Sequence, residues 1–277
     1  MNQIDQDYKN FIVEIIRGPD YECAPRQLKI YEKLNHTFEL NMDLPIMTIR
    51  ERNLNYRFMF GEAAWILDGR NDLLTISKYM KNIKRFSDDG VTFFGAYGPK
   101  IITQISYIVD TLKKDKDSRQ AVLTIWRENP RSSKDIPCTV AMQFFLRPRG
   151  DELYLHCITT MRSNDVWLGL PYDSFNFSAI SFVIACHLNN LGIQCKLGRL
   201  YINAGSRHLY ETNLKDAHLI RAAIQNYECE FSFNELIEKY KLNPMRIVET
   251  LYQAADITIG KEDGLTLPDK LQIIKNG

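Results

Sequence analysis

The sequence lacks the features that mark exported, membrane-embedded and zinc-binding proteins. Its first residues contain no basic region followed by an apolar run, so they do not resemble a signal peptide, and we expect a cytoplasmic protein. No apolar run reaches the length of a membrane span. The six cysteines are scattered singly, with no Cys-x-x-Cys pair, which disfavours a zinc site or a disulfide framework and predicts reduced thiols.

An excess of charge of one sign is also absent. The 35 basic and 34 acidic residues leave a net charge of +1. We therefore expect no whole-molecule attraction to polymeric nucleic acid or to a membrane, although local arginines could bind a small anion. The 277 residues, 45% hydrophobic and 25% charged, suffice for a sizeable core. No repeat or linker divides them, so a single domain over 1–277 is expected.

The hydrophobic pattern predicts a sheet accompanied by several helices. Strands are expected over 121–126, 139–147, 152–160 and 196–203, the second and third forming a hairpin through 148–151, while 91–97 could be strand or loop. Helices are expected over 50–68 and 72–85, over a buried segment 174–191, from a capping box at 232–235, and over 245–255 after Asn243-Pro244. Because strands and helices do not alternate regularly, the predicted class is α+β.

Cys138 is a candidate nucleophile. It follows Pro137 at the mouth of a predicted strand. A cysteine thiolate is suited to adding to C6 of a pyrimidine, provided that nearby positive charge lowers the thiol pKa. Arg119, Arg127, Arg131 and Arg162 could supply that charge. The alternative is an ordinary buried thiol.

Other polar residues suggest a binding site for a nucleotide. Arg162-Ser163 places a guanidinium fork beside a hydroxyl, which suits a phosphate, although a surface salt bridge would look the same. Asp165 could accept two hydrogen bonds from a heterocycle or belong to a turn. Gly169 permits close approach to a ring or a tight turn.

Three further side chains have both a functional and a structural interpretation. His208 and Tyr210, two apart in an extended segment, project to one side and could hold a sugar hydroxyl, or they could be structural. Glu62 lies within an apolar helical pattern, where a carboxylate either stabilises a polar network or positions water near a substrate.

The order of these motifs resembles that of the thymidylate synthase family. The shared motifs are Asp117-Ser118-Arg119, Pro137-Cys138, Arg162-Ser163-Asn164-Asp165-Val166, Leu168-Gly169-Leu170-Pro171 and Gly205-Ser206-Arg207-His208-Leu209-Tyr210, with Glu62 and Tyr97-Gly98 upstream. The resemblance covers roughly residues 24–213. It implies α+β subunits that pair sheet against sheet as a homodimer, 5,10-methylenetetrahydrofolate as co-substrate, and no need for a metal.

The resemblance also implies a role for each residue. Cys138 would add to C6 and Glu62 would position water. The phosphate would be bound by Arg162, Ser163, Arg26 and, from the partner subunit, Arg119, while His208 and Tyr210 would hold the sugar hydroxyl. The folate would be contacted by Asp165, Gly169, Tyr97 and Phe86.

The sequence departs from the family pattern at several positions. Gln120 replaces a second arginine and Thr139 replaces a common histidine. Phe86 is the nearest candidate for the tryptophan that packs on folate. The last residues, Ile-Ile-Lys-Asn-Gly, differ from the small apolar tail of the methylating members, which disfavours the final reduction to a methyl product.

Asp173 stands where an uncharged asparagine would be expected, and it indicates the cytosine branch, the deoxycytidylate hydroxymethylases. A carboxyl group can accept from the 4-amino group of cytosine and, when protonated, donate to N3. A carboxylate facing O4 of uracil would oppose two acceptors, which costs about a few kcal/mol in a desolvated site. Proton delivery at N3 would also stabilise the ring after Cys138 adds to C6.

The predicted activity is therefore conversion of dCMP to 5-hydroxymethyl-dCMP. Three alternatives stay open: a CMP hydroxymethylase, a thymidylate synthase that methylates dUMP, and a non-catalytic nucleotide-binding or RNA-binding relative. Ser163 beside the sugar-phosphate leaves less room for a 2′-hydroxyl than alanine would, which favours the deoxynucleotide.

Overall fold

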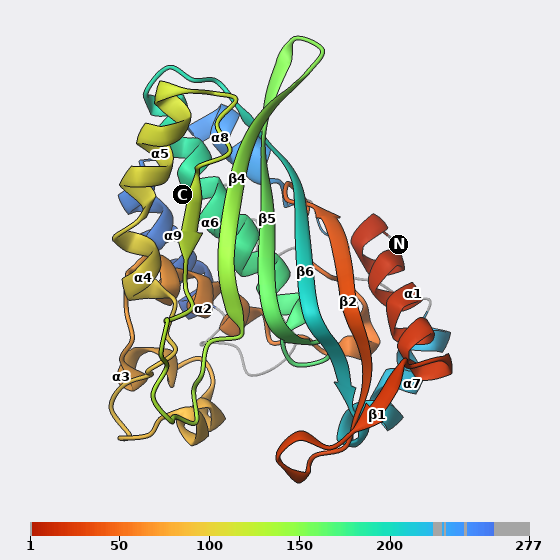
Figure 1. The fold of residues 1–277 in the computed structure, drawn as a ribbon. Coiled ribbons are helices and arrows are strands. Elements are labelled where there is room, and N and C mark those ends of the chain that lie inside the picture. Colours follow the sequence, from red (N-terminus) through yellow and green to blue (C-terminus); the bar gives the residue numbers. More distant parts are fainter. Residues whose placement is uncertain (1, 224–228, 230, 241–242, 258–277) are drawn as a thin grey trace.

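The chain forms a six-stranded mixed sheet with helices packed on it, which confirms the predicted α+β class (Figure 1). The computed structural model describes residues 2–223, 229, 231–240 and 243–257. The strand order is β1-β2-β6-β5-β4-β3, and β5 and β6 run parallel while the other neighbours are antiparallel. The strands are β1 (Tyr21–Cys23), β2 (Ile30–Asn41), β3 (Val122–Thr124), β4 (Thr139–Arg149), β5 (Glu152–Asp165) and β6 (Lys196–Tyr210).

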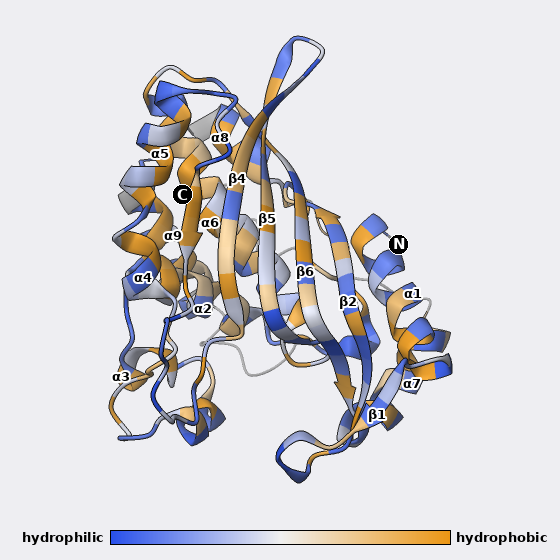
Figure 2. Cartoon of the chain, viewed as in Figure 1, coloured by the Kyte–Doolittle hydropathy of each residue, from blue (hydrophilic) through white to orange (hydrophobic). Residues whose placement is uncertain are grey.

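The helices gather behind the sheet and beside β2, and those drawn in Figure 1 leave the front face of the sheet open. The α-helices of the described residues are α1 (Gln3–Arg17), α2 (Tyr56–Leu67), α3 (Leu73–Ile76), α4 (Gly98–Ile102), α5 (Ile105–Lys114), α6 (Leu170–Asn190), α7 (Leu214–Ala222), α8 (Phe233–Tyr240) and α9 (Pro244–Ile257). None of these is long and apolar enough to cross a membrane. Figure 2 shows apolar and polar residues alternating along several strands, as expected for strands with one covered face.

The buried helix predicted over 174–191 is confirmed as α6. Its apolar side chains are buried around most of its circumference, and its buried serines donate to carbonyls four residues earlier, as Ser178 does to Ser174 (2.7 Å). Pro171 in the first turn moves its start to Leu170. Gly192, with φ +83°, ends it, and the Gly192 and Ile193 N–H groups bond back to the last turn.

The helix predicted over 50–68 begins later than expected. Asn53 adopts a left-handed conformation (φ +47°), and the Asn55 side chain accepts from the Phe58 N–H (3.0 Å), so α2 starts at Tyr56. Its predicted end at Gly69 is confirmed, with φ +69° at the glycine. The last turn is closed by bonds from the N–H groups of Gly69 and Arg70.

The single helix predicted over 72–85 is wrong. The segment forms the short α3 and a separate 3-10 helix, Lys81–Phe86, because Met80 is extended between them. The ring of Tyr79 packs directly on Gly61 of α2, where an added Cβ would lie 2.5 Å from the ring. This contact holds the chain against α2 and outweighs local helix propensity. Residues 91–97 form a loop with one bridge, Asp72 to Thr92.

The other predicted elements are confirmed with shifted ends. The hairpin of β4 and β5 turns at Gly150 (φ +62°), and both β5 and β6 extend past their predicted limits into the motifs of the candidate site. The strand predicted over 121–126 is shorter, and α9 follows Asn243 as expected. The predicted helix start at 232–235 is α8, where Ser232 Oγ accepts from the Glu235 N–H (3.0 Å).

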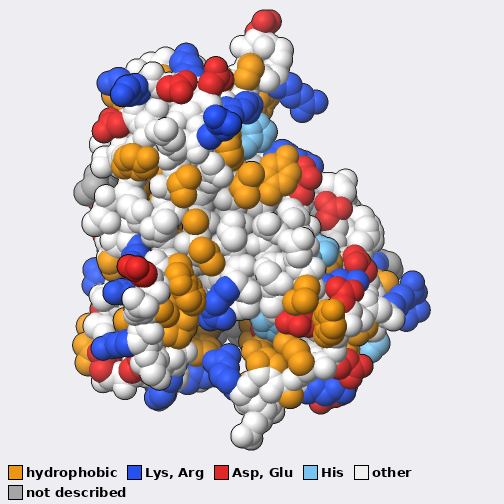
Figure 3. All heavy atoms as spheres, viewed as in Figure 1, with side chains coloured by type: hydrophobic (Ala, Val, Ile, Leu, Met, Phe, Trp, Pro, Cys, Tyr) orange, Lys and Arg blue, Asp and Glu red, His pale blue; other side chains and the backbone are white. Residues whose placement is uncertain are grey.

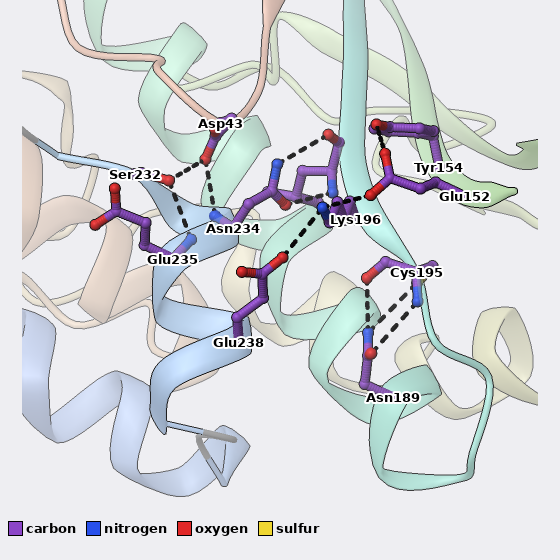
Figure 4. Close-up of polar contacts among 11 residues, drawn as sticks. Asp43, Glu152, Tyr154, Asn189, Cys195, Lys196, Ser232, Asn234, Glu235 and Glu238 are labelled. Carbon is purple, nitrogen blue, oxygen red and sulfur yellow. Dashed lines mark hydrogen bonds and ion pairs between the residues drawn. The ribbon is translucent and has the colours of Figure 1, made fainter. Parts of the chain in front are cut away.

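The start of α8 is fixed to the rest of the fold by polar contacts (Figure 4). Asp43 accepts hydrogen bonds from the Ser232 hydroxyl (2.6 Å) and from the Asn234 N–H (2.8 Å). Nearby, Lys196 lies between the carboxylates of Glu152 (2.6 Å) and Glu238 (3.1 Å). These last three residues line a cavity of about 480 Å³, and because its lysine is already paired we assign it no role in the chemistry.

Candidate active site

Cys138, Arg162 and Ser163 meet where β4 begins and β5 ends. The Arg162 backbone N–H donates to the Cys138 carbonyl (2.8 Å), which holds the end of β5 beside the residue that precedes β4. Arg162 Nη2 and Ser163 Oγ each lie 3.6 Å from Cys138 Sγ. The guanidinium is oriented by the carbonyls of Pro137 and Ile136, both at 2.9 Å. The structure therefore places a guanidinium and a hydroxyl against the candidate nucleophile.

Two opposing effects act on the Cys138 thiol. Burial raises its pKa, whereas the Arg162 charge and the hydrogen bond from Ser163 lower it. Burial is the larger effect, so the pKa is raised overall. Formation of the nucleophilic thiolate therefore depends on Arg162 and Ser163 remaining close to the sulfur.

Asp173 lies in the first turn of α6 and is half-buried. Its Oδ2 accepts a hydrogen bond from Asn164 Nδ2 (2.8 Å) on β5. Burial, followed by the nearby charge of Glu62, raises the pKa of Asp173 to about 8, and the charge of Arg207 and the Asn164 bond act in the opposite direction. At neutral pH this side chain is mostly a neutral carboxylic acid, able to donate as well as accept.

Glu62 is a second carboxyl group with a perturbed pKa. It projects from the middle of α2, and its Oε2 accepts from Asn176 Nδ2 (2.8 Å) on α6. Burial raises the pKa of Glu62 to about 7, against a smaller lowering by the Asn176 bond. Asn176 Oδ1 is buried without a partner in the described part of the chain, so this amide can bond to a further polar group such as water.

Asp165 and His208 are paired on the parallel strands β5 and β6. Asp165 Oδ1 accepts from the N–H groups of Trp167 (2.8 Å) and Leu168 (3.0 Å), which is the turn role that its sequence position also allowed. Burial raises the pKa of Asp165 and lowers that of His208. His208 Nδ1 is buried and, among the described residues, has no partner, which fits a hydroxyl group of a ligand. The His208 and Tyr210 ring centroids lie 5.1 Å apart, as their spacing predicted.

Gly169 and Tyr97 complete the surroundings of Cys138 and Asp173. A Cβ at Gly169 would lie 3.1 Å from Asp173 Oδ2, so a side chain there would crowd the carboxyl group. The Tyr97 hydroxyl accepts from the N–H (3.2 Å) and the hydroxyl (3.0 Å) of Thr139, next to Cys138. Burial raises the pKa of Tyr97 well above its ordinary value, so it stays a phenol.

Three of the predicted site residues do not join this cluster. Phe86 is 41% exposed, with Arg85 over its ring. Arg26 is exposed in the turn before β2, with φ +54°. Arg119 is exposed, and its carbonyl accepts from Gln143 of β4 (2.8 Å). Gln143 lies five residues along the strand from Cys138, or about 17 Å at the rise of a β-strand.

Two residues of the cluster had no predicted role. Asn164 lies inside the Arg-Ser-Asn-Asp motif and bonds to Asp173, and Arg207 donates from Nη1 to Asn164 Oδ1 (2.6 Å). Arg207 is fully buried, although arginine is among the least commonly buried residues. The sequence does contain one indication of such a role, because Arg207 stands between Ala204 and Leu209 in a strand whose inward-facing residues are mostly apolar.

Comparison with known proteins agrees with the geometry. Residues 6–257 match the family model described as thymidylate synthase. The chain is 33% identical over 144 residues to a deoxyuridylate hydroxymethyltransferase of Pseudomonas phage M6, a match that covers 49% of this chain and 40% of that protein. It is 30% identical over 227 residues to a protein of the same name from Bacillus phage SP01, covering 74% of this chain and 56% of the relative.

The chain thus spans only 40% and 56% of the length of those two phage relatives. It is also 24% identical over 225 residues to a thymidylate synthase of Buchnera aphidicola, covering 74% of this chain and 81% of that enzyme. Members of this family transfer one-carbon units from methylenetetrahydrofolate to pyrimidine nucleotides. On the match over 6–257, the chain belongs to the thymidylate synthase family.

Proposed function

We propose that residues 1–277 act as a single catalytic domain that converts dCMP to 5-hydroxymethyl-dCMP, with 5,10-methylenetetrahydrofolate as co-substrate. The observation that carries the substrate assignment is Asp173, a half-buried carboxyl group whose pKa is raised to about 8. As a neutral acid it can donate to N3 of cytosine through one oxygen and accept from the 4-amino group through the other.

The same carboxyl group serves the chemistry of the ring. Addition of the Cys138 thiolate to C6 forms the S–C6 bond and moves an electron pair toward N3 and C5. A proton delivered from Asp173 to N3 stabilises that species, in a site where burial strengthens each hydrogen bond. Arg162 and Ser163 support the nucleophile through their 3.6 Å contacts with the sulfur.

Glu62 is the group we assign to the water that completes the reaction. C5 forms a bond to the methylene carbon of the folate, C5 then loses its proton, and tetrahydrofolate leaves, so that an exocyclic methylene remains on the ring. A water held by Glu62 and Asn176 adds to this methylene carbon, and Glu62 accepts a proton from the water. The C5–C6 double bond forms again as the Cys138–C6 bond breaks, which releases the thiolate and the hydroxymethyl product. A pKa of about 7 suits a group that exchanges protons near neutral pH. The addition of water in place of hydride distinguishes a hydroxymethyl product from a methyl product.

The remaining residues bind the nucleotide and the folate in this proposal. Arg162 and Ser163 hold the phosphate with Arg26, and His208 and Tyr210 hold the sugar hydroxyl. Asp165, Gly169, Tyr97 and Phe86 face the folate. The unpartnered Nδ1 of His208 supports the sugar contact, whereas Phe86, at 41% exposed, would need the bound folate to cover it.

A homodimer explains the position of Arg119. Because Arg119 lies too far along the sheet to reach Cys138 of its own subunit, we propose that it binds the phosphate in the partner subunit. The front face of the sheet, seen in Figure 3 with apolar side chains among the polar ones, is the surface that would pair. Phe145 and Ile158 project from its central strands and are half-buried in the single chain.

A second candidate substrate is dUMP, which is favoured by the names of the two phage relatives. A neutral carboxyl group can also pair with uracil, by accepting from N3–H and donating to O4. The two bases therefore require the proton of Asp173 on opposite oxygens.

Mass spectrometry of products from dCMP, CMP and dUMP, each incubated with methylenetetrahydrofolate, tests the proposal. A hydroxymethyl adduct on dCMP is the expected result. The same adduct mainly on CMP would overturn the assignment of the sugar. A hydroxymethyl adduct mainly on dUMP would overturn the assignment of the base. A methyl group on dUMP would overturn both the assignment of the base and the addition of water. The variant Cys138→Ala should give no product with any of the three.

A further inference from the structure

Arg207 on β6 is a buried cation without a directly paired carboxylate in the part of the chain that the structure describes. Its side chain is 0% exposed. Nη2 donates to the carbonyl of Ile202 (2.7 Å), and Nη1 donates to Asn164 Oδ1 (2.6 Å). Burial lowers the pKa of Arg207 to about 9, which still leaves it charged at neutral pH. Burying such a charge costs free energy, so we expect the hydrogen bonds of Arg207 to have a role in the site beyond stabilising the fold.

The bond from Arg207 fixes the orientation of the Asn164 side chain. Asn164 is 2% exposed and has one acceptor and one donor end. Its oxygen faces the guanidinium, so its Nδ2 must face Asp173, where it donates to Oδ2 (2.8 Å). The opposite orientation would place the amide N–H groups against the guanidinium N–H groups and the amide oxygen against Asp173.

The bond from Asn164 distinguishes the two oxygens of Asp173. In a neutral carboxylic acid, the oxygen without the proton is the better acceptor. Because Oδ2 receives the Asn164 N–H, the form with the proton on Oδ1 is stabilised. Oδ2 keeps a second lone pair with which to accept from a base.

We propose that Arg207, acting through Asn164, fixes the proton of Asp173 on Oδ1 and thereby makes the base site select one pyrimidine over the other. The inference rests on the proposed function in that Asp173 faces the base. Cytosine needs the proton on the oxygen that faces N3, and uracil needs it on the oxygen that faces O4. A carboxylic acid free to carry its proton on either oxygen would accept both bases. Arg207 is thus a positioning residue that does not touch the substrate.

Arg207 also acts on Asp173 through its charge. Glu62 on α2 and Asp165 on β5 raise the pKa of Asp173, and Arg207 lowers it. Cys138 and Tyr97 lie close enough for their pKa values to respond to Asp173 in turn. Removal of Arg207 should therefore move the alkaline limit of activity, which reflects loss of the Asp173 proton, to higher pH.

The test compares kcat/KM for dCMP and dUMP in the full-length wild-type enzyme and two variants. Arg207→Met removes the charge and the donors, and Asn164→Asp keeps the volume and an acceptor for Arg207 but removes the N–H to Asp173. Each variant should reduce the ratio of kcat/KM for the preferred nucleotide to that for the other about 10- to 100-fold. The reason is that the disfavoured base no longer has to form a mismatched hydrogen bond with Asp173. Arg221→Met, an exposed position on α7, is the matched control and should keep the ratio.

The outcomes separate this inference from the proposed function. If the wild-type enzyme prefers dUMP, the dCMP assignment fails, but a loss of preference in both variants still supports the role of Arg207. If both variants lose turnover equally on the two nucleotides and keep the wild-type ratio within about twofold, the inference is overturned and Arg207 is merely structural. Should Arg207→Met fail to fold, as judged by circular dichroism, Asn164→Asp alone decides by the same ratio.

Discussion

Replacing Asp173 by asparagine should remove a large part of the pH dependence of folding stability. The side chain is half-buried, and desolvation by the surrounding protein raises its pKa from 3.8 to about 8 on folding. Because the folded chain disfavours the carboxylate and the unfolded chain does not, stability is fully present below pH 3.8 and is lost as pH rises toward the folded pKa. Asparagine has a similar shape and does not titrate.

The size of the effect follows from the two pKa values. With 1.36 kcal/mol for each unit of pKa, the linkage relation gives a loss of roughly 3 to 4 kcal/mol from Asp173 between pH 5 and pH 8. This is a large fraction of the 5 to 15 kcal/mol typical of a whole domain. The variant should therefore gain on the wild type by about that amount across the interval.

Urea unfolding at pH 5, 6, 7 and 8, followed by tryptophan fluorescence, measures this difference. Asp216→Asn, at an exposed position on α7, should run parallel to the wild type. If the difference in unfolding free energy between Asp173→Asn and the wild type is the same at pH 5 and pH 8, then Asp173 is not a neutral acid in the folded chain. An ionised Asp173 could not donate a proton to N3 of cytosine, so it would not recognise the base as proposed.

Three further predictions concern single contacts. Arg162→Met should raise the pKa of Cys138 and slow the alkylation of this thiol by iodoacetamide at pH 8 by several-fold, as measured by intact mass. The control Arg221→Met should leave the alkylation rate unchanged. An unchanged rate in Arg162→Met would refute the role of the Arg162 charge. Glu62→Gln should lower turnover by about 10²- to 10⁴-fold while nucleotide binding, measured by calorimetry, changes little; equal turnover would exclude Glu62 from proton transfer. Ser232→Ala should cost about 1 kcal/mol of unfolding free energy in urea through loss of the α8 cap, whereas Ser232→Asn should largely preserve it.

The sequence predicted the parts of the fold that depend on local chemistry. Gly69 and Gly192 end their helices as expected because a left-handed residue is required there, and Ser232 begins α8 because its hydroxyl satisfies a backbone N–H. The predicted helix over 72–85 failed because Tyr79 packs on Gly61, a contact between distant segments that no local pattern reveals. The strands β1 and β2 and the helices α1, α4, α5 and α7 were not predicted at all.

In the candidate site, too, the residues that belong to local motifs were predicted and those whose roles depend on strand pairing were not. The motif order identified Cys138, Arg162, Ser163 and Asp173, which the structure brings together. Asn164 and Arg207 were missed because their roles arise only from the pairing of β5 with β6, which places one beside the other. Arg26, Arg119 and Phe86 remain predictions, since their assigned partners are a nucleotide, a second subunit and a folate.

The parallel pairing of β5 and β6 has a consequence for how this site can change. Three successive rungs of the ladder join Ser163 to Ser206, Asn164 to Arg207 and Asp165 to His208. Each rung therefore places a residue of one motif directly beside a residue of the other, although the whole of α6 separates the two segments in the chain. A new base preference that begins with Asp173 would have to be accompanied by matched substitutions on both strands, so the two motifs should vary as one unit among related sequences.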